Sequence, residues 1–156
     1  ARGRDARCAS NLKALGAGVH AFCADNNGLF PMKTQEISQE DYWHRQISTY
    51  LGATNFDAFT GRSKMENVFL CPSDPKPYFG KQSYGMNSEL RGKRLTQVSR
   101  ISAILIADSS NPSLTPTRAK TNHTGHVHFV RVDGSFGKVT NVGTPVTAPE
   151  IWLISR

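Results

Sequence analysis

The residues best suited to chemistry in this sequence are three histidines that lie close together, His123, His126 and His128. His126 and His128 are two positions apart in a β-like segment, so both imidazoles are expected on one strand face, where they could bind one metal ion. A third ligand could come from His123 or Asp133. No acidic residue forms a metalloprotease motif with them at helical spacing. We therefore favour strand histidines in cross-strand contacts, assign no catalytic residue, and keep a metal-dependent enzyme as the third alternative.

The three cysteines, Cys8, Cys23 and Cys71, allow one intramolecular disulfide and leave one thiol. Their spacing matches neither a zinc ribbon nor a CxxC redox motif. If a disulfide forms, Cys71 is the shared partner and pairs with Cys8 or Cys23, and the sequence does not choose between them. Such a bond closes a loop of about 50 residues and adds a few kcal/mol. Nothing beside Cys71 marks a general base, which argues against a cysteine nucleophile.

Charged side chains suggest two further candidate sites. Lys plus Arg number 19 against 12 Asp plus Glu, a net charge of +7, and the excess is spread out except at Arg91, Lys93 and Arg94. This cluster is a candidate patch for DNA or an acidic polysaccharide, but a dispersed excess is typical of solvated surface, and nucleic acid is not the expected partner. Asp108–Asn111 and Asp74 offer oxygens for a structural calcium ion, although their acidic density is low for such a site. We expect no other cofactor.

Length and composition favour one folded domain over residues 1–156. A chain of 156 residues can bury one proper core, and its 38% apolar and 20% charged residues are ordinary for a globular protein. No stretch approaches the roughly 20 apolar residues of a membrane-spanning helix, and no signal peptide is visible. As given, the chain is expected to be soluble.

A long helix is predicted over residues 1–27. Its buried face is indicated by residues that recur every three or four positions, namely Cys8, Leu12, Leu15, Val19 and Phe22. Gly28 can end the helix because it tolerates positive φ, and Pro31 makes continuation unfavourable. The first seven residues contain no convincing N-cap, so this helix is expected to be the downstream half of a longer one.

A second helix is predicted from about Gln39 to Leu51, where Ser38 and Asp41 approximate a capping box. It belongs to a variable middle region, residues 28–100. Its expected buried stripe consists of Trp43, Ile47, Tyr50 and Leu51.

The last part of the chain, residues 101–156, is predicted to form an antiparallel sheet. A central strand is expected at 101–107, and a hairpin at 126–132 and 135–140, joined by a two-residue type I′ turn at Asp133-Gly134. Two shorter predictions are a strand at 83–87 and an edge strand or core segment at 151–154. The fold class is therefore α+β, with a long N-terminal helix packed on a small C-terminal antiparallel sheet.

Several segments, in this order, resemble one family. The sequence is similar to type IV pilin-like proteins and type II secretion pseudopilins of the prepilin cleavage/methylation class, in the subgroup found in planctomycetes, lentisphaerae and verrucomicrobia. The segments that carry this resemblance are Cys8–Gly16, Ala24–Pro31, Phe69–Asp74, Ser83–Asn87, Ile104–Ser109 and Asn122–Ser135. Each motif is short, and the resemblance extends over most of the chain, from Cys8 to Ser135.

The resemblance implies a pilin-like fold and a membrane helix upstream of residue 1 that is absent from this sequence. It also implies processing by a prepilin peptidase, methylation, anchoring in a bacterial inner membrane with the domain in the periplasm, and assembly with other pilin-like subunits and inner-membrane machinery. The expected function is that of a structural subunit of an envelope fibre in protein export. The alternative is a pilus-associated binding module that uses Arg91, Lys93 and Arg94.

Overall fold

The computed structural model describes residues 2–31, 43–51, 68–78, 82–123 and 125–140, together with Trp152 and Ile154. The helices are α1 (Arg2–Asp25) and α2 (Trp43–Ile47), with 3₁₀ turns at Ser48–Leu51, Ser88–Leu90, Leu95–Gln97 and Pro116–Arg118. The strands are β1 (Tyr84–Asn87), β2 (Ile104–Asp108), β3 (Ser113–Leu114), β4 (His126–Arg131) and β5 (Phe136–Thr140).

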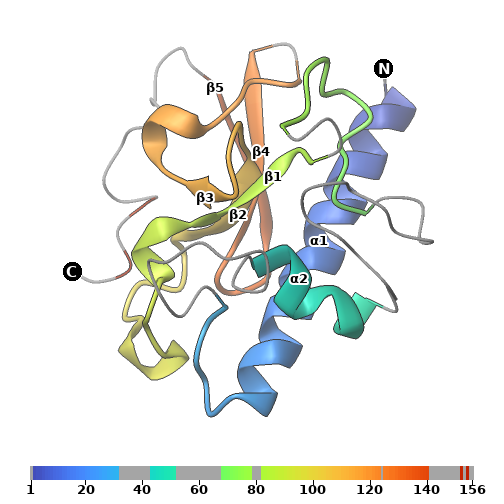
Figure 1. Ribbon diagram of the computed structural model, residues 1–156. Coiled ribbons are helices and arrows are strands. Elements are labelled where there is room, and N and C mark those ends of the chain that lie inside the picture. Colours follow the sequence, from blue (N-terminus) through green and yellow to red (C-terminus); the bar gives the residue numbers. More distant parts are fainter. Residues whose placement is uncertain are drawn as a thin grey trace.

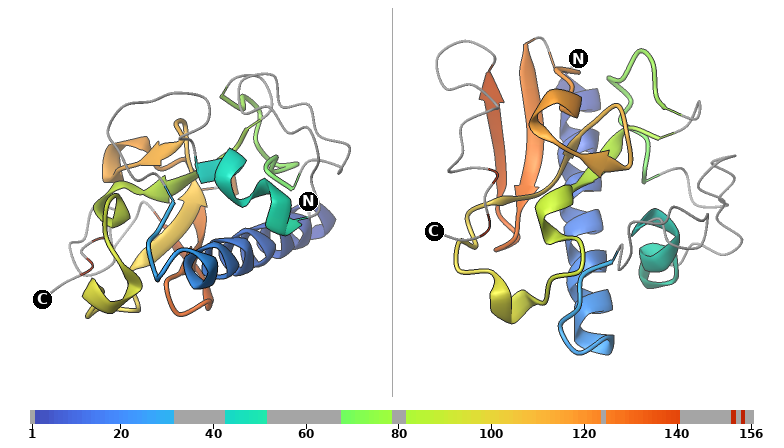
Figure 2. Two further views of the ribbon diagram at one scale, coloured as in Figure 1. Left: turned by 60° about the horizontal axis from the view of Figure 1, so that its bottom comes forward. Right: turned by 60° about the vertical axis from the view of Figure 1, so that its left-hand side comes forward.

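The strands form one sheet in the order β3-β1-β2-β4-β5, and α1 packs along one face of it (Figures 1 and 2). This confirms the α+β class and the long N-terminal helix. The expectation of a purely antiparallel, C-terminal sheet was wrong in two respects. The β1 strand comes from the middle region of the chain and pairs antiparallel with β2, and β3 pairs parallel with β1.

The buried face of α1 follows the predicted periodicity. Its fully buried residues are Cys8, Leu12, Leu15, Val19 and Cys23, whereas the predicted Phe22 is only half-buried. A Cβ on Gly16 would lie 3.2 Å from Cγ2 of Val130, so this glycine allows the helix to approach β4 closely. At the helix end Gly28 has φ +80° and donates its N–H to the Cys23 carbonyl at 2.7 Å, which confirms its predicted role.

The α-helical part of the second helix ends four residues earlier than predicted. Trp43 and Ile47 are buried as expected, but the chain turns to 3₁₀ at Ser48, and the start predicted at residues 39–42 lies outside the described residues. Tyr50, predicted to be buried, is exposed. Its hydroxyl donates to the Asp25 carboxylate at 2.7 Å, and a tyrosine hydroxyl finds such a polar partner more easily at the surface than in an apolar core.

The central strand starts three residues later than predicted. Ile101 is 55% exposed, and its carbonyl accepts the N–H of Asp133 instead of joining the strand ladder. Within β2 the register shifts, since Ile104 pairs with Arg131 and Ile106 with Val130. The extra residue is therefore Leu105, a β-bulge.

The bulge decides which side chains of β2 face α1. Leu105 and Ile106 both enter the core on the helix side of the sheet, whereas Ile104 and Ala107 enter the core on the opposite side. Alternation then places Asp108 on the helix side. A strand without the bulge would present Asp108 to the other face.

The hairpin between β4 and β5 lies where it was predicted, but its turn is of another type. Only Gly134 of the Asp133-Gly134 pair has positive φ, +87°. Gly134 donates to the Arg131 carbonyl and Arg131 to the Ser135 carbonyl, which closes a three-residue loop. Asp133 keeps ordinary φ and accepts hydrogen bonds from the backbone N–H and hydroxyl of Ser135.

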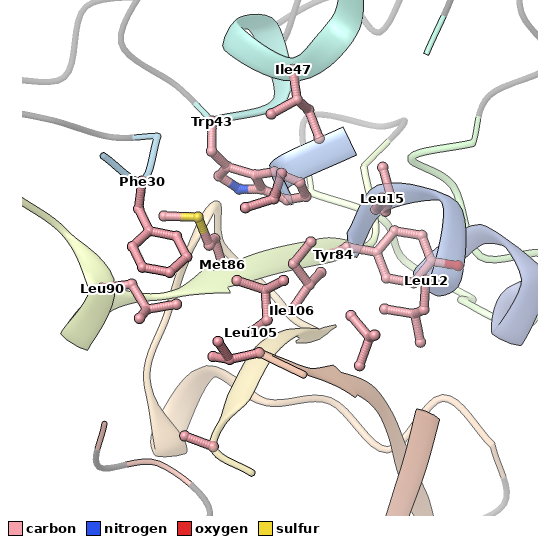
Figure 3. Close-up of a cluster of buried hydrophobic side chains, with 14 of the residues drawn as sticks. Leu12, Leu15, Phe30, Trp43, Ile47, Tyr84, Met86, Leu90, Leu105 and Ile106 are labelled. Carbon is pink, nitrogen blue, oxygen red and sulfur yellow. The ribbon is translucent and has the colours of Figure 1, made fainter. Parts of the chain in front are cut away.

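Two cores hold the sheet, one on each face. The larger one lies between the sheet, α1 and α2, and Figure 3 shows its centre, to which α2 contributes Trp43, β1 contributes Tyr84 and α1 contributes Leu12. The smaller core on the opposite face consists of Ile104, Ala107, Leu114, Val127, Phe129 and Trp152. In the predicted segment 151–154, Trp152 and Ile154 are buried, and the other two residues lie outside the described residues.

Replacing Gly85 with alanine is expected to lower the free energy of unfolding by about 2 kcal/mol, the usual range for overpacking. A Cβ at this position of β1 would lie 2.5 Å from the Asn111 carbonyl oxygen and 2.8 Å from the Ser109 hydroxyl. The control is Gly3→Ala on α1, where a Cβ meets nothing within 4 Å and should stabilise the helix slightly. Urea unfolding of both variants tests this, and equal midpoints would contradict it.

Candidate functional site

Side chains from five parts of the chain meet between α1 and the sheet. We call this group the polar cluster, and its members are Asp5, Asp108, His123, His128 and the Cys8–Cys71 disulfide. Helix α1 supplies Asp5 and Cys8 from its first two turns. The remaining members come from the loop before β1, the end of β2, the turn before β4, and β4 itself.

His123 is the centre of the polar cluster. Its Nδ1 lies 2.7 Å from Oδ1 of Asp5, and its Nε2 lies 3.1 Å from Oδ2 of Asp108. Burial disfavours the charged imidazole, but the hydrogen bonds and charges of Asp108 and Asp5 outweigh it and raise the pKa of His123. The hydrogen bond from His123 in turn lowers the pKa of Asp5, whose side chain is 46% exposed. The imidazole therefore joins the helix to the sheet through two carboxylates.

Asp108 is the buried anchor of this arrangement. Its side chain is fully buried, and Oδ2 accepts the backbone N–H of His128 at 2.9 Å as well as facing His123. Burial raises the pKa of Asp108, and the contacts with His123 and His128 oppose this rise. The side-chain hydrogen bond from Asn122 also opposes this rise in pKa.

His128 stacks on His123. The ring centroids are 3.6 Å apart and the planes differ by 4°. Burial and the neighbouring charge of His123 lower the pKa of His128 to about 4. The pair therefore consists of an imidazole whose charged form is favoured, covered by one whose neutral form is favoured.

The disulfide joins α1 to the loop that precedes β1. Of the two pairings open from the sequence, the structure has Cys8–Cys71, with Cα atoms 5.0 Å apart. Sγ of Cys71 lies 3.5 Å from Nε2 of His123, so the disulfide borders the imidazole directly. Cys23 is a buried free thiol near the other end of α1, and burial raises its pKa to about 11.

The three histidines do not converge as a ligand set. Imidazole lone pairs lie in the ring plane, and the parallel, stacked planes of His123 and His128 share no point where one ion could bind both. His126 directs Nδ1 to the His123 carbonyl oxygen at 3.1 Å. Asp133 lies in the hairpin turn at the opposite end of β4.

The candidate calcium ligands bind protein groups instead. Asp74 forms an ion pair with Nζ of Lys120 at 2.6 Å and accepts the backbone N–H of Lys76. Asp108 belongs to the polar cluster. The hydroxyl of Ser109 donates to the Asn111 carbonyl oxygen, which forms a local turn.

Two members of the candidate anionic patch also contact the protein itself. Arg91 donates to the hydroxyl of Ser113 at 2.9 Å, and Arg94 donates to the Asn27 carbonyl oxygen at 2.7 Å. The side chain of Lys93 is exposed. This segment therefore joins the end of α1 to the sheet edge, which leaves fewer cations for an external anion.

Sequence reasoning missed Asp5 and the role of Asp108 beside His123. Asp5 stands three residues before Cys8, so both project from one side of α1, and this spacing was a usable signal. The face of Asp108 could not be inferred without the bulge.

The polar cluster holds and orients an imidazole more than it exposes one. His123 is only 4% exposed, and the nearby hydroxyl of Ser73 donates to Asp5 at 3.1 Å instead of facing the imidazole.

In the part of the chain that the structure describes, no helix is long and apolar enough to cross a membrane. Comparison with models of protein families, with curated proteins and with solved structures found no match.

Proposed function

We propose that this chain is the domain of a pilin-like subunit, a pseudopilin, that acts by assembly in an envelope fibre for protein export. The observation that carries the proposal is the single 24-residue helix laid along one sheet face and fixed there by the polar cluster. In a fibre whose subunits are held together through their helices, a pulling force on the helix must be transmitted to the rest of the domain. The disulfide and the two His123 contacts provide this rigid connection at the N-terminal end of α1.

The outer face of α1 supports the same proposal. Its exposed residues are Gly3, Arg4, Ala6, Arg7, Ser10, Lys13, Ala17, Ala24 and Asp25. Those up to Ala17 form a stripe of small and basic residues along the first two thirds of a helix about 36 Å long. Small residues allow neighbouring helices to approach closely, and the arginines and lysine offer charges to a neighbour.

The proposed location follows from the resemblance and from the disulfide. An oxidising envelope compartment permits the Cys8–Cys71 bond to persist. In the full-length protein, an apolar helix ahead of residue 1 would anchor the precursor, and a prepilin peptidase would process it. Assembly would then bury that apolar helix against neighbouring subunits.

Cross-linking in fibres tests the proposal. Ser10→Cys and Ala17→Cys, introduced into the full-length gene in its native host, should give oxidation-dependent ladders of covalent multimers in envelope fractions. The control is Thr117→Cys, an exposed position in the 3₁₀ turn Pro116–Arg118. Multimers that are absent at both helix positions, or equally strong at position 117, would contradict a helix-centred fibre.

A further inference from the structure

The disulfide and His123 place three atoms close together that could bind a metal ion if the disulfide were reduced. The sulfur atoms of Cys8 and Cys71 and a ring nitrogen of His123 all lie within 4.8 Å of one another. All three side chains are buried, and they come from α1, from the loop before β1 and from the turn before β4. Thiolate and imidazole are the ligands preferred by zinc and other borderline divalent ions.

We propose that the reduced protein binds one zinc ion through Cys8, Cys71 and His123, so that the metal and the disulfide occupy this position alternately. A dithiol reduces the disulfide by transferring two electrons and two protons, and it becomes a disulfide itself. A phosphine supplies the two electrons and becomes the phosphine oxide, while water supplies the oxygen and the two protons; both reactions give two thiols. The ion then binds both sulfurs and displaces the two thiol protons. This inference is independent of the proposed fibre, since it concerns the chemistry of the buried site alone.

The distances suit a tetrahedral ion. With metal–ligand bonds of about 2.0–2.3 Å, the ligand atoms of a tetrahedral zinc site lie roughly 3.3–3.8 Å apart. Nε2 of His123 is already 3.5 Å from Sγ of Cys71. The main adjustment is the separation of the two sulfurs, which rotation of the cysteine side chains can provide once their bond is broken.

The surrounding carboxylates suit a metal-bound histidine. Asp5 lies on Nδ1 of His123 at 2.7 Å, so it can accept the Nδ1–H and leave Nε2 as the ligand atom. A carboxylate behind a metal-binding imidazole fixes its tautomer and increases its basicity. On the other side, the buried carboxylate of Asp108 lies 3.1 Å from Nε2, which makes it the nearest further candidate ligand.

Cobalt(II) spectroscopy on the Cys23→Ala protein tests the proposal, since this background removes the third thiol. After anaerobic reduction with a phosphine, one equivalent of Co²⁺ should give tetrahedral d–d bands and a thiolate charge-transfer band, and Zn²⁺ should abolish both. The oxidised protein should give neither signal. A reduced protein that shows no tetrahedral spectrum at saturating Co²⁺ would overturn the proposal.

Matched histidine variants locate the site. His123→Gln should weaken zinc binding at least about ten-fold in competition with a chromophoric chelator. His126→Gln, three residues away, should leave the affinity within about two-fold. Equal affinities in the two variants would overturn the assignment. If the reduced chain is unfolded, zinc must restore its native circular dichroism, and failure to do so would also overturn it.

Discussion

Replacing Cys8 and Cys71 together with alanine is expected to lower the free energy of unfolding by about 4 kcal/mol. The disulfide joins residues 63 positions apart. Without this cross-link the unfolded chain gains conformational entropy, and for a loop of this length the gain favours unfolding by about 4 kcal/mol. Single domains are stable by only about 5–15 kcal/mol, so the variant should be close to the limit of folding. The effect is large because the bond fixes α1 to a loop that is remote in sequence.

Guanidinium unfolding at neutral pH measures this difference, and Cys23→Ala is the matched control. Cys23 is buried on the same helix but forms no disulfide, so its replacement removes a similar side chain without opening a loop. A double variant within about 1 kcal/mol of this control would show that the disulfide contributes little to stability.

Replacing Asp108 with asparagine is expected to lower the free energy of unfolding by about 3–5 kcal/mol at pH 6, the usual loss when one partner of a buried ion pair is removed. Asp108 is fully buried, and it faces both Nε2 of His123 and the backbone of His128. Asp5→Asn changes the other carboxylate on the same imidazole, but that side chain is 46% exposed, so its loss should be below about 1 kcal/mol. Similar losses in the two variants would contradict the central role of the buried carboxylate.

The pH dependence of stability gives a second test of the polar cluster. The pKa of His123 is raised in the folded protein, so its contribution is complete below the unfolded value of 6.5 and is lost as the pH rises through the folded value. His44 is a buried residue of α2, and burial lowers its pKa to about 3. The lowered pKa values of His44 and of His128, the latter about 4, act in the opposite direction. They make the protein less stable as the pH falls below 6.5, because the unfolded chain binds protons there that the folded chain does not.

The oxidised protein in the presence of a chelator should therefore be most stable near pH 6.5. Measured between pH 6 and pH 9, the loss in Asp108→Asn relative to the parent should shrink as the pH rises, because deprotonation of His123 removes the charge that Asp108 stabilises. A loss that stays constant over this range would show that the charge of His123 does not stabilise the fold.

Much of the fold follows from local patterns in the sequence. The apolar period of three and four residues predicts α1, because a helix with one buried stripe needs it. Gly28 and Gly134 mark chain reversals because both adopt positive φ. The class of the fold was therefore predictable, whereas the parallel pairing of β3 was not, since a two-residue strand carries no period of its own.

The candidate site was only partly predictable. The histidines stood out by type and spacing, but their contacts depend on how distant segments pack. Cys8 and Cys23 both lie on the buried stripe of α1, and the choice between them depends on where the loop with Cys71 crosses the helix. Asp5 became a partner of His123 across 118 positions, a relation that no local pattern contains.

Because of the bulge at Leu105, the position of Asp108 in the polar cluster depends on the number of residues in β2. Each strand residue alternates between two faces, so removal of Leu105 would invert the phase of Ile106–Asp108 relative to α1. Asp108 would then project from the face that carries the smaller core, and Ala107 would project toward α1. Leu105 lies outside the polar cluster, but it acts as a spacer that keeps the Asp108 carboxylate on the face of the sheet that α1 covers.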